Sequence, residues 1–236
     1  MSTFIEKLNK IAKAESAGMG FRKASDTASD KKMQVVSCQP LAKAADMAGA
    51  DAGLLVIEGR LNKEALKSIP KDMIWGAWLK TGGAAEAKTL KDAGCDFVVF
   101  SSGTGLSLIG EKDLSKVLEV AAFESDSMLR TLVDLPVEAL LVSVDNGGAP
   151  LTWQDLMVLK RFGGFPNKPL MTVVTTAVSA PELEALWCAG VKAVITENPI
   201  DDMMKEVAKA DFKQADEKSK DGPAVRQPGS GFGLRG

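Results

Sequence analysis

One lysine stands at a position where an amine can take part in chemistry. Lys80 follows the apolar run Trp75–Leu79, and Gly82 and Gly83 come just after it. Contact with tryptophan and leucine removes water from an ammonium group, which favours the neutral amine as a base or a Schiff-base nucleophile. The two glycine amides can bind an anion beside it, because glycine lets the backbone approach a ligand closely. The alternative is a solvated lysine at the end of a strand.

Acidic side chains follow several other apolar runs in the same way. Those interpreted as candidate catalytic groups, together with Lys80, are Glu58, Asp145 and Glu197. They would transfer protons or form salt bridges with Arg60 and Lys80. Carboxylates can also share a Mg²⁺ ion, which takes oxygen ligands. Spacing alone assigns no metal site, and it identifies no cofactor.

A second group of residues is expected to bind the substrate or an anion. Ser101 and Ser102 open a glycine-bearing loop that can surround a phosphate or a carboxylate. With Arg60, Gly82 and Gly83 they complete the candidate binding set. The loop lacks the GK[ST] ending of a phosphate-binding P-loop, and most such loops are only turns.

Composition excludes several classes of chemistry. The 236 residues include no histidine and no tyrosine, which excludes Ser-His-Asp and Cys-His nucleophiles and histidine-ligated metals. The net charge of −2 argues against a nucleic-acid or anionic-membrane partner, and no apolar run is long enough to span a membrane. Three scattered cysteines and the absence of a secretory signal predict a cytoplasmic protein. A small-molecule ligand is compatible with all of this, and the sequence sets no oligomeric state.

Eight short apolar runs must position these residues. They are Met33–Cys38, Gly53–Glu58, Met73–Leu79, Asp96–Ser101, Val117–Phe123, Ala139–Asp145, Leu170–Thr175 and Ala193–Glu197. Nearly uninterrupted apolar runs are typical of parallel strands that are buried on both faces. Helical patterns separate most of them, so we predict an α/β fold, a compact (β/α)8 TIM barrel with short outer helices. The competing prediction is an open doubly wound sheet.

The chain divides into three predicted parts. Residues 1–32 form an amphipathic helix and a linker, residues 33–212 the barrel, and residues 213–236, with few apolar side chains, a disordered tail. The helix is expected to cover the amino-terminal end of the barrel or to contact a partner. Its apolar face consists of Phe4, Ile5, Leu8 and Ile11.

Two phrases repeat the order of helix, Ala-Gly and apolar strand. They are Lys91-Asp92-Ala93-Gly94-Cys95-Asp96-Phe97-Val98-Val99 and Glu184-Ala185-Leu186-Trp187-Cys188-Ala189-Gly190-Val191-Lys192-Ala193-Val194. In this style the chain resembles the aldolase-type and phosphate-binding barrel enzymes as a broad class. The resemblance implies a site at the carboxyl ends of the strands and a phosphate after strands seven and eight.

The sequence departs from that class at the implied phosphate site. A capping box is predicted over Ser179–Glu182, and Asn198 is predicted to cap the last helix. Asp201 and Asp202 then place negative charge at the positive end of that helix, where it would repel a phosphate. We therefore expect the usual phosphate site to be absent or rebuilt, and an anion to bind first at Lys80.

Two functions stay open at this point. The first is a small-molecule lyase or isomerase that acts on a phosphorylated or carboxylate substrate at the carboxyl-terminal rim. The alternative is a non-catalytic barrel that acts as a binding or assembly module. The absence of histidine favours the second, because histidine is the commonest acid–base group near neutral pH. A flavin barrel is a third, weaker interpretation.

Overall fold

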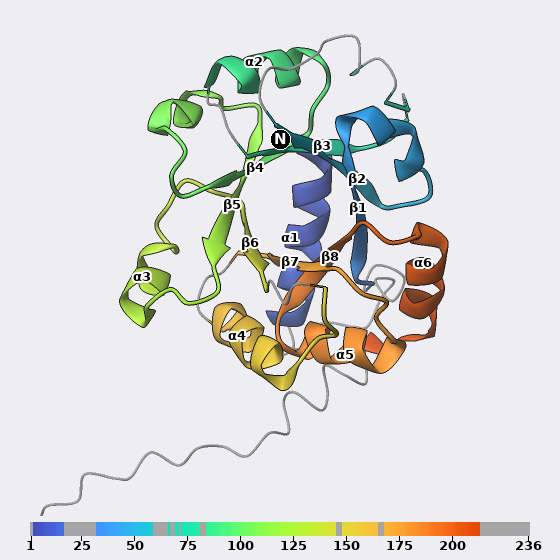
Figure 1. Ribbon diagram of the computed structural model, residues 1–236. Coiled ribbons are helices and arrows are strands. Elements are labelled where there is room, and N and C mark those ends of the chain that lie inside the picture. The colour runs from blue at the N-terminus through green and yellow to red at the C-terminus, as the bar shows by residue number, and fades with distance from the viewer. Residues whose placement is uncertain are drawn as a thin grey trace, which may run out of the picture.

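In the computed structural model, eight parallel strands close into a barrel in sequence order (Figure 1). Strand β1 pairs with β8 as well as with β2, so no strand edge is left open. This confirms the predicted (β/α)8 barrel over the open sheet. The structure describes residues 2–16, 32–58, 66, 69–70, 72–80, 84–144, 148–164 and 168–212.

The strands lie where apolar runs were predicted, and each boundary falls within two residues of the expected one. The strands are β1 Gln34–Pro40, β2 Ala52–Ile57, β3 Trp75–Leu79, β4 Phe97–Ser101, β5 Ser115–Ala121, β6 Ala139–Ser143, β7 Leu170–Val174 and β8 Val191–Thr196. Strand β5 begins and ends two residues earlier than predicted, which changes the residues that it delivers to the rim.

The outer layer is uneven. It consists, after the N-terminal helix α1 Thr3–Ser16, of η1 Leu41–Met47, α2 Ala84–Asp92, η3 Leu106–Gly110, α3 Asp126–Thr131, α4 Trp153–Gly163, α5 Ala180–Cys188 and α6 Ile200–Lys209. The first connection carries a 3₁₀ helix, η1, instead of an α-helix, and α3 has only six residues, in keeping with the short outer helices that the sequence predicts. The connection between β4 and β5 must reverse the direction of the chain twice, which leaves too few residues for an α-helix as long as a strand. Only the 3₁₀ helix η3 forms there.

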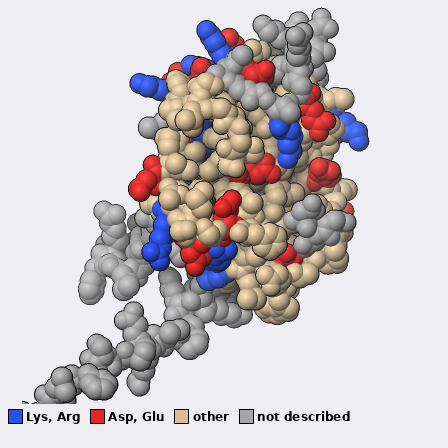
Figure 2. Space-filling view, turned by 60° about the vertical axis from the view of Figure 1, so that its left-hand side comes forward, with Lys and Arg blue, Asp and Glu red and all other residues tan. Residues whose placement is uncertain are grey.

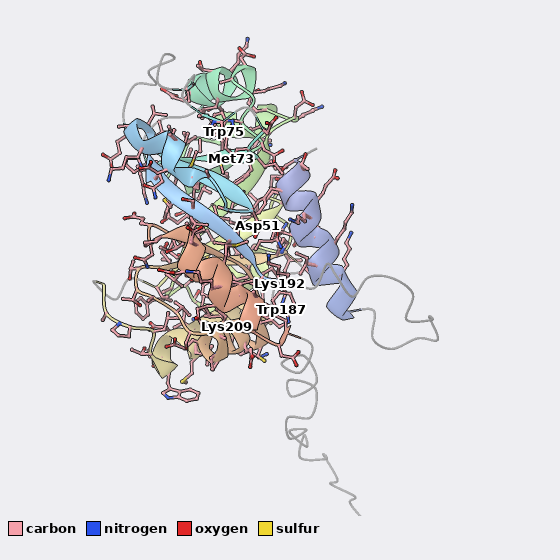
Figure 3. All side chains as sticks on the ribbon, turned by 90° about the vertical axis from the view of Figure 1, so that its right-hand side faces the viewer. Asp51, Met73, Trp75, Trp187, Lys192 and Lys209 are labelled. Carbon is pink, nitrogen blue, oxygen red and sulfur yellow. The ribbon has the colours of Figure 1, made fainter. Side chains whose placement is uncertain are left out.

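Alternate residues of each strand face the inside and the outside of the barrel. Trp78 packs in the inner cluster, whereas Trp75 packs outside it among Met47 and Leu90. Figure 3 shows Trp75 near Met73 on this outer side. The two tryptophans of β3 therefore point to opposite faces, as residues three apart in a regular strand do.

Helix α1 closes the amino-terminal end of the barrel. Phe4 stacks on Phe97 of β4, with the ring centroids 5.1 Å apart, and Leu8 belongs to the same inner cluster. Gly76 of β3 makes room for Phe97, because a Cβ there would lie 2.5 Å from its ring. In Figure 1, α1 is seen through the ring of strands. The expectation that this helix covers the barrel end is confirmed.

Carboxylate side chains accept hydrogen bonds from the backbone at the closed end of the barrel. Each belongs to the residue just before an even-numbered strand, β2, β4 or β6. Asp96 accepts from the backbone N–H of Phe4 at 3.0 Å, and from the hydroxyl of Ser2. Asp51 accepts from the N–H of Val35 at 2.9 Å, and Glu138 does the same for Lys116. These residues hold the loops at the closed end in place.

The glycines that precede these positions adopt the left-handed conformation that the repeat predicts. They are Gly49, Gly94 and Gly190, with φ of 91°, 86° and 104°. After Gly190 the repeating position is held by Lys192, the second residue of β8, instead of an acid. Its Nζ lies 4.0 Å from the ring centroid of Trp187, and Figure 3 shows the two side chains together.

Within the described residues, every helix is too short or too polar to cross a membrane. The tail predicted for 213–236 and most of the linker predicted before residue 33 lie outside the described residues. The limits of the three predicted parts therefore stay predictions.

Candidate functional site at the mouth of the barrel

The carboxyl ends of the strands meet at the end opposite α1, and they form the open mouth of the barrel. Lys80 comes directly after β3, one residue beyond Leu79. It lies on the same side of the chain as Trp78, which faces the barrel interior. The chain thus brings the lysine to the mouth, as the sequence predicted.

The partner of Lys80 is a residue that sequence reasoning missed. Glu119 lies in β5 between Leu118 and Val120, and its alternation with Val117 places it on the inner face. The run predicted for strand five began and ended two residues too late, and no residue within it was named as a candidate. The signal was present as a single charge within an otherwise apolar run.

Lys80, Trp78 and Glu119 form one connected group, here called the mouth cluster. The indole Nε1 of Trp78 donates a 2.9 Å hydrogen bond to Oε2 of Glu119. The Nζ of Lys80 lies 3.8 Å from Oε1 of Glu119 and 3.5 Å from the centroid of the Trp78 ring. Each carboxylate oxygen thus faces a different donor, which fixes the orientation of the carboxylate.

The mouth cluster remains accessible to small solutes. The side chain of Lys80 is 40% exposed and that of Glu119 is 23% exposed. Trp78 lies beneath them and is buried. A cation, a carboxylate and an apolar floor therefore meet at an open edge, which is an arrangement that can bind a polar group and exchange protons with it.

Cys38 of β1 is buried and lies within electrostatic reach of this region. Burial raises the pKa of its thiol to about 12, and the negative charge of Glu197 acts in the same direction. The positive charge of Lys80 opposes them with a smaller effect. The thiol therefore stays protonated at neutral pH, and thiolate is the form that attacks.

The other candidate residues are distributed around the rim. Glu58 and Glu197 are exposed, and Ser101 pairs in register with Glu119 of the neighbouring strand. Ser101 and Ser102 both line a cavity of about 170 Å³ at the side of the barrel. The candidates outside the described residues are Arg60, Gly82, Gly83 and Asp145.

One hydroxyl near the mouth has no described partner. Ser143 ends β6, and its alternation with Leu141 and Ala139 places it on the inner face. Its Oγ is buried and makes no hydrogen bond with any described group. A buried hydroxyl without a partner costs free energy, so this one is available to a ligand that enters the mouth.

The helix ends after β7 and β8 carry negative charge. Glu182 accepts a 2.8 Å hydrogen bond from the N–H of Ser179, which confirms the predicted capping box. Asp201 and Asp202 lie in the first turn of α6, as predicted. The prediction that Asn198 caps α6 was wrong, because its amide donates to the carbonyl of Thr175 instead. Among the described residues, no group of three or more acids or cysteines is arranged to hold a metal ion.

No family model and no curated protein sequence matches the chain. Solved structures match it in fold. The 3-hexulose-6-phosphate synthase of Salmonella typhimurium has a TM-score of 0.56 at 18% identity, over 79% of this chain and 100% of that one. Dihydropteroate synthase of Xanthomonas albilineans gives 0.54 at 12% identity, over 75% and 91%.

Phosphoribosyl anthranilate isomerase of Thermococcus kodakaraensis gives a TM-score of 0.52 at 13% identity, over 74% of this chain and 98% of that one. At these identities the likeness extends to the fold and no further. The closed ring of eight parallel strands and these matches together show that the chain folds as a TIM barrel.

Proposed function

We propose that the protein is a lyase or isomerase that acts at the mouth of the barrel. Its substrate would be a small carbonyl compound that carries a phosphate or a carboxylate. The observation that carries the proposal is the mouth cluster, in which Lys80 and Glu119 lie 3.8 Å apart above a buried indole. Such a pair supplies a base and a cation to one reacting group.

The chemistry that suits this pair is proton transfer next to a carbonyl. Glu119 removes a proton from the carbon beside the carbonyl group, and the electron pair of that C–H bond moves to form an enolate. The ammonium group of Lys80 donates a hydrogen bond to the oxygen, where the negative charge collects. Return of the proton to the neighbouring carbon completes an isomerisation. In a lyase Glu119 instead takes the proton of a hydroxyl group on the second carbon from the carbonyl, the O–H electron pair forms a new carbonyl group, and the electron pair of the broken carbon–carbon bond forms the same stabilised enolate, which is then protonated.

Two further observations support an anionic substrate at this place. The names of two matched enzymes, 3-hexulose-6-phosphate synthase and phosphoribosyl anthranilate isomerase, denote phosphorylated compounds. The acids Glu182, Asp201 and Asp202 disfavour a phosphate at α5 and α6. Lys80 is a described cation at the mouth to which such a group can bind. The anion site at Gly82 and Gly83 stays a prediction, because both lie outside the described residues.

Hydrogen–deuterium exchange tests the proposal without knowledge of the full substrate. The protein is incubated in D₂O with pyruvate or dihydroxyacetone phosphate, and loss of the proton signal next to the carbonyl is followed by NMR. We expect Glu119→Gln to reduce exchange by about 10²–10⁴-fold, the usual contribution of a general base. Lys80→Met should reduce it as well.

Lys91→Met is the matched control. Lys91 has a similar side-chain exposure of 38% and also pairs with a carboxylate, Asp113, but on the outer surface. Exchange at the wild-type rate in Glu119→Gln, or no exchange above buffer in the wild type, would contradict the proposal. Treatment with cyanoborohydride adds a second measurement, since a reduced adduct on Lys80 would show that the amine condenses with the carbonyl instead.

A non-catalytic assembly module is the second candidate. The observation that favours it is the set of large apolar side chains exposed on one side of the barrel. That feature is independent of the mouth cluster, and the two functions do not exclude each other.

A further inference from the structure

The exposed large apolar side chains are confined to one stretch of the described chain. They are Leu106, Ile109, Phe123, Met128, Val133, Leu135, Trp153 and Met157. All of them belong to the side of the barrel that carries η3, α3 and α4, where the outer layer is thin. Figure 2 turns the left-hand side of Figure 1 forward and shows broad uncharged areas there. Clustered exposure of this kind marks an interaction surface.

One part of this side is the outer surface of α4 and α5, here called the α4–α5 face. Trp153 is 82% exposed, and Met157 follows one helical turn later on the same side of α4. Two adjoining hollows of about 560 and 640 Å³ lie between the helices. Trp153, Leu156 and Ala185 line both of them. The face therefore offers a protruding indole and an apolar depression next to each other.

The two ends of the α4–α5 face carry opposite charges. The acid Glu182 lines the hollow at the start of α4 and α5. The base Lys160 lines the other hollow, at the far end of α4, and keeps its positive charge because its partner is the neutral carbonyl of Cys188, whereas Arg161 beside it is paired with Asp126. A second copy of the face, related to the first by a 180° rotation, places its acidic end against the basic end of the first copy and its basic end against the acidic end. Such complementarity favours two antiparallel copies of α4 over two parallel ones.

We propose that the α4–α5 face binds the same face of a second copy of this chain. The two α4 helices run antiparallel about a two-fold axis, so every contact is made twice. Trp153 of each copy fills the apolar hollow of the other. Glu182 of each copy meets Lys160 of the other at the edge of the interface.

The apolar area of the α4–α5 face and of the adjoining β5–α3 segment is close to what such a dimer needs. The loop and helix that carry Phe123 and Met128 adjoin α4, since Arg161 bonds to Asp126 at 2.8 Å. An aromatic side chain buries about 150–250 Å², so Phe123, Met128, Trp153 and Met157 together offer on the order of 500 Å². The walls of the hollows bring this close to the ~800 Å² that each partner contributes to a stable interface.

Sedimentation equilibrium of the full chain tests the proposal, with the wild type compared with Trp153→Glu. We expect a wild-type dimer of twice 24.9 kDa and a dissociation constant raised at least 100-fold in the variant. Leu106→Glu is the matched control, because Leu106 is 80% exposed but lies on η3, away from the face. This control should dimerise like the wild type. Circular dichroism establishes that each variant is folded, and Met157→Glu serves if Trp153→Glu is not.

Each result decides the question. A monomeric wild type at 100 μM, or an undiminished dimer in both Trp153→Glu and Met157→Glu, would overturn the proposal. Dissociation by Leu106→Glu to the same degree would also overturn it, because the contact would then lie elsewhere. An assembly larger than a dimer would contradict the two-fold arrangement. Residues of the mouth cluster do not line this face, so failure of the dimer leaves the proposed chemistry to its own test.

Discussion

Two lysines of this barrel lie on the faces of two tryptophans, one pair at each end. At the mouth, Nζ of Lys80 is 3.5 Å from the ring centroid of Trp78. Near the closed end, Nζ of Lys192 is 4.0 Å from the ring of Trp187. The contact is the same, but Lys192 is only 3% exposed while the side chain of Lys80 is 40% exposed.

The difference in exposure indicates that the same cation–π contact has a different role at each end of the barrel. A cation over an indole gains more when water is excluded, so the pair at Lys192 stabilises the packing of α5 against β8. The pair at Lys80 gains less, because water competes for the ammonium group. In return, Lys80 can reach a dissolved molecule. The buried pair at the closed end thus contributes to stability, whereas the exposed pair at the mouth presents a cation that a ligand can contact.

The largest effect is expected from opening the closed end. Phe4→Ala removes a fully buried ring that stacks on Phe97. We expect a loss of about 3–5 kcal/mol in the free energy of unfolding, measured by urea denaturation. Leu106→Ala, at an exposed position, should change it by less than about 0.5 kcal/mol. If Phe4→Ala cost less than about 1 kcal/mol, α1 would not be part of the core.

Substituting the two lysines tests the comparison directly. Lys192→Met should lower the free energy of unfolding by about 2 kcal/mol, because a desolvated cation–π contact is lost. Lys80→Met should change it by less than about 0.5 kcal/mol, since its ion pair is partly exposed. Thermal and urea unfolding of the two variants side by side provide the measurement. Equal losses would show that burial does not distinguish the two pairs.

Gly94→Val sharpens the description of the closed end by testing the turn that carries Asp96. Gly94 has a φ of +86°, and a Cβ there would meet no atom within 4 Å. The cost is therefore that of the left-handed backbone alone, about 1–2 kcal/mol in urea denaturation. Gly110→Val is the control, because its space is also open and its φ is not positive. Similar stabilities for the two variants would rule out a special backbone at Gly94.

The smallest effect concerns the pH dependence of Cys38 at the mouth. Its pKa is raised to about 12 in the folded protein, from an ordinary value of 9.0. Alkylation by iodoacetamide should therefore keep rising with pH above 9, where glutathione reaches a plateau. Peptide mass spectrometry follows the rate, and a plateau for Cys38 near pH 9 would contradict the assignment. The unfolded chain releases this proton first, so the thiol's contribution to stability is lost as pH rises from about 9 toward 12.

The fold was predictable because its main signals are local. Strands such as Leu54–Ile57 and Val191–Ile195 are buried on both faces, and this produces apolar runs that a single sequence displays. Gly94 and Gly190 mark helix ends by a backbone conformation that other residues avoid. Outer helices were harder to predict, because the length of the connection decides whether a segment such as η3 can form a full helix.

The site was only half predictable, because its contacts are distant in sequence. Lys80 could be found at the end of its own strand. Glu119 is 41 residues from Trp78, and their hydrogen bond exists only because β3, β4 and β5 are neighbours in a closed ring. Predicting Glu119 required the limits of β5 and its inside–outside alternation, and the predicted run began and ended two residues too late.

The four tryptophans lie in different parts of the molecule, so tryptophan fluorescence can follow each part separately. The chain has four tryptophans and no tyrosine, so its ultraviolet emission comes from four indoles in different surroundings. Trp78 lies at the mouth, Trp153 on the proposed dimer face, and Trp75 and Trp187 lie in the outer core. Replacing each by phenylalanine would give four emission signals, which separately follow ligand entry, association and unfolding.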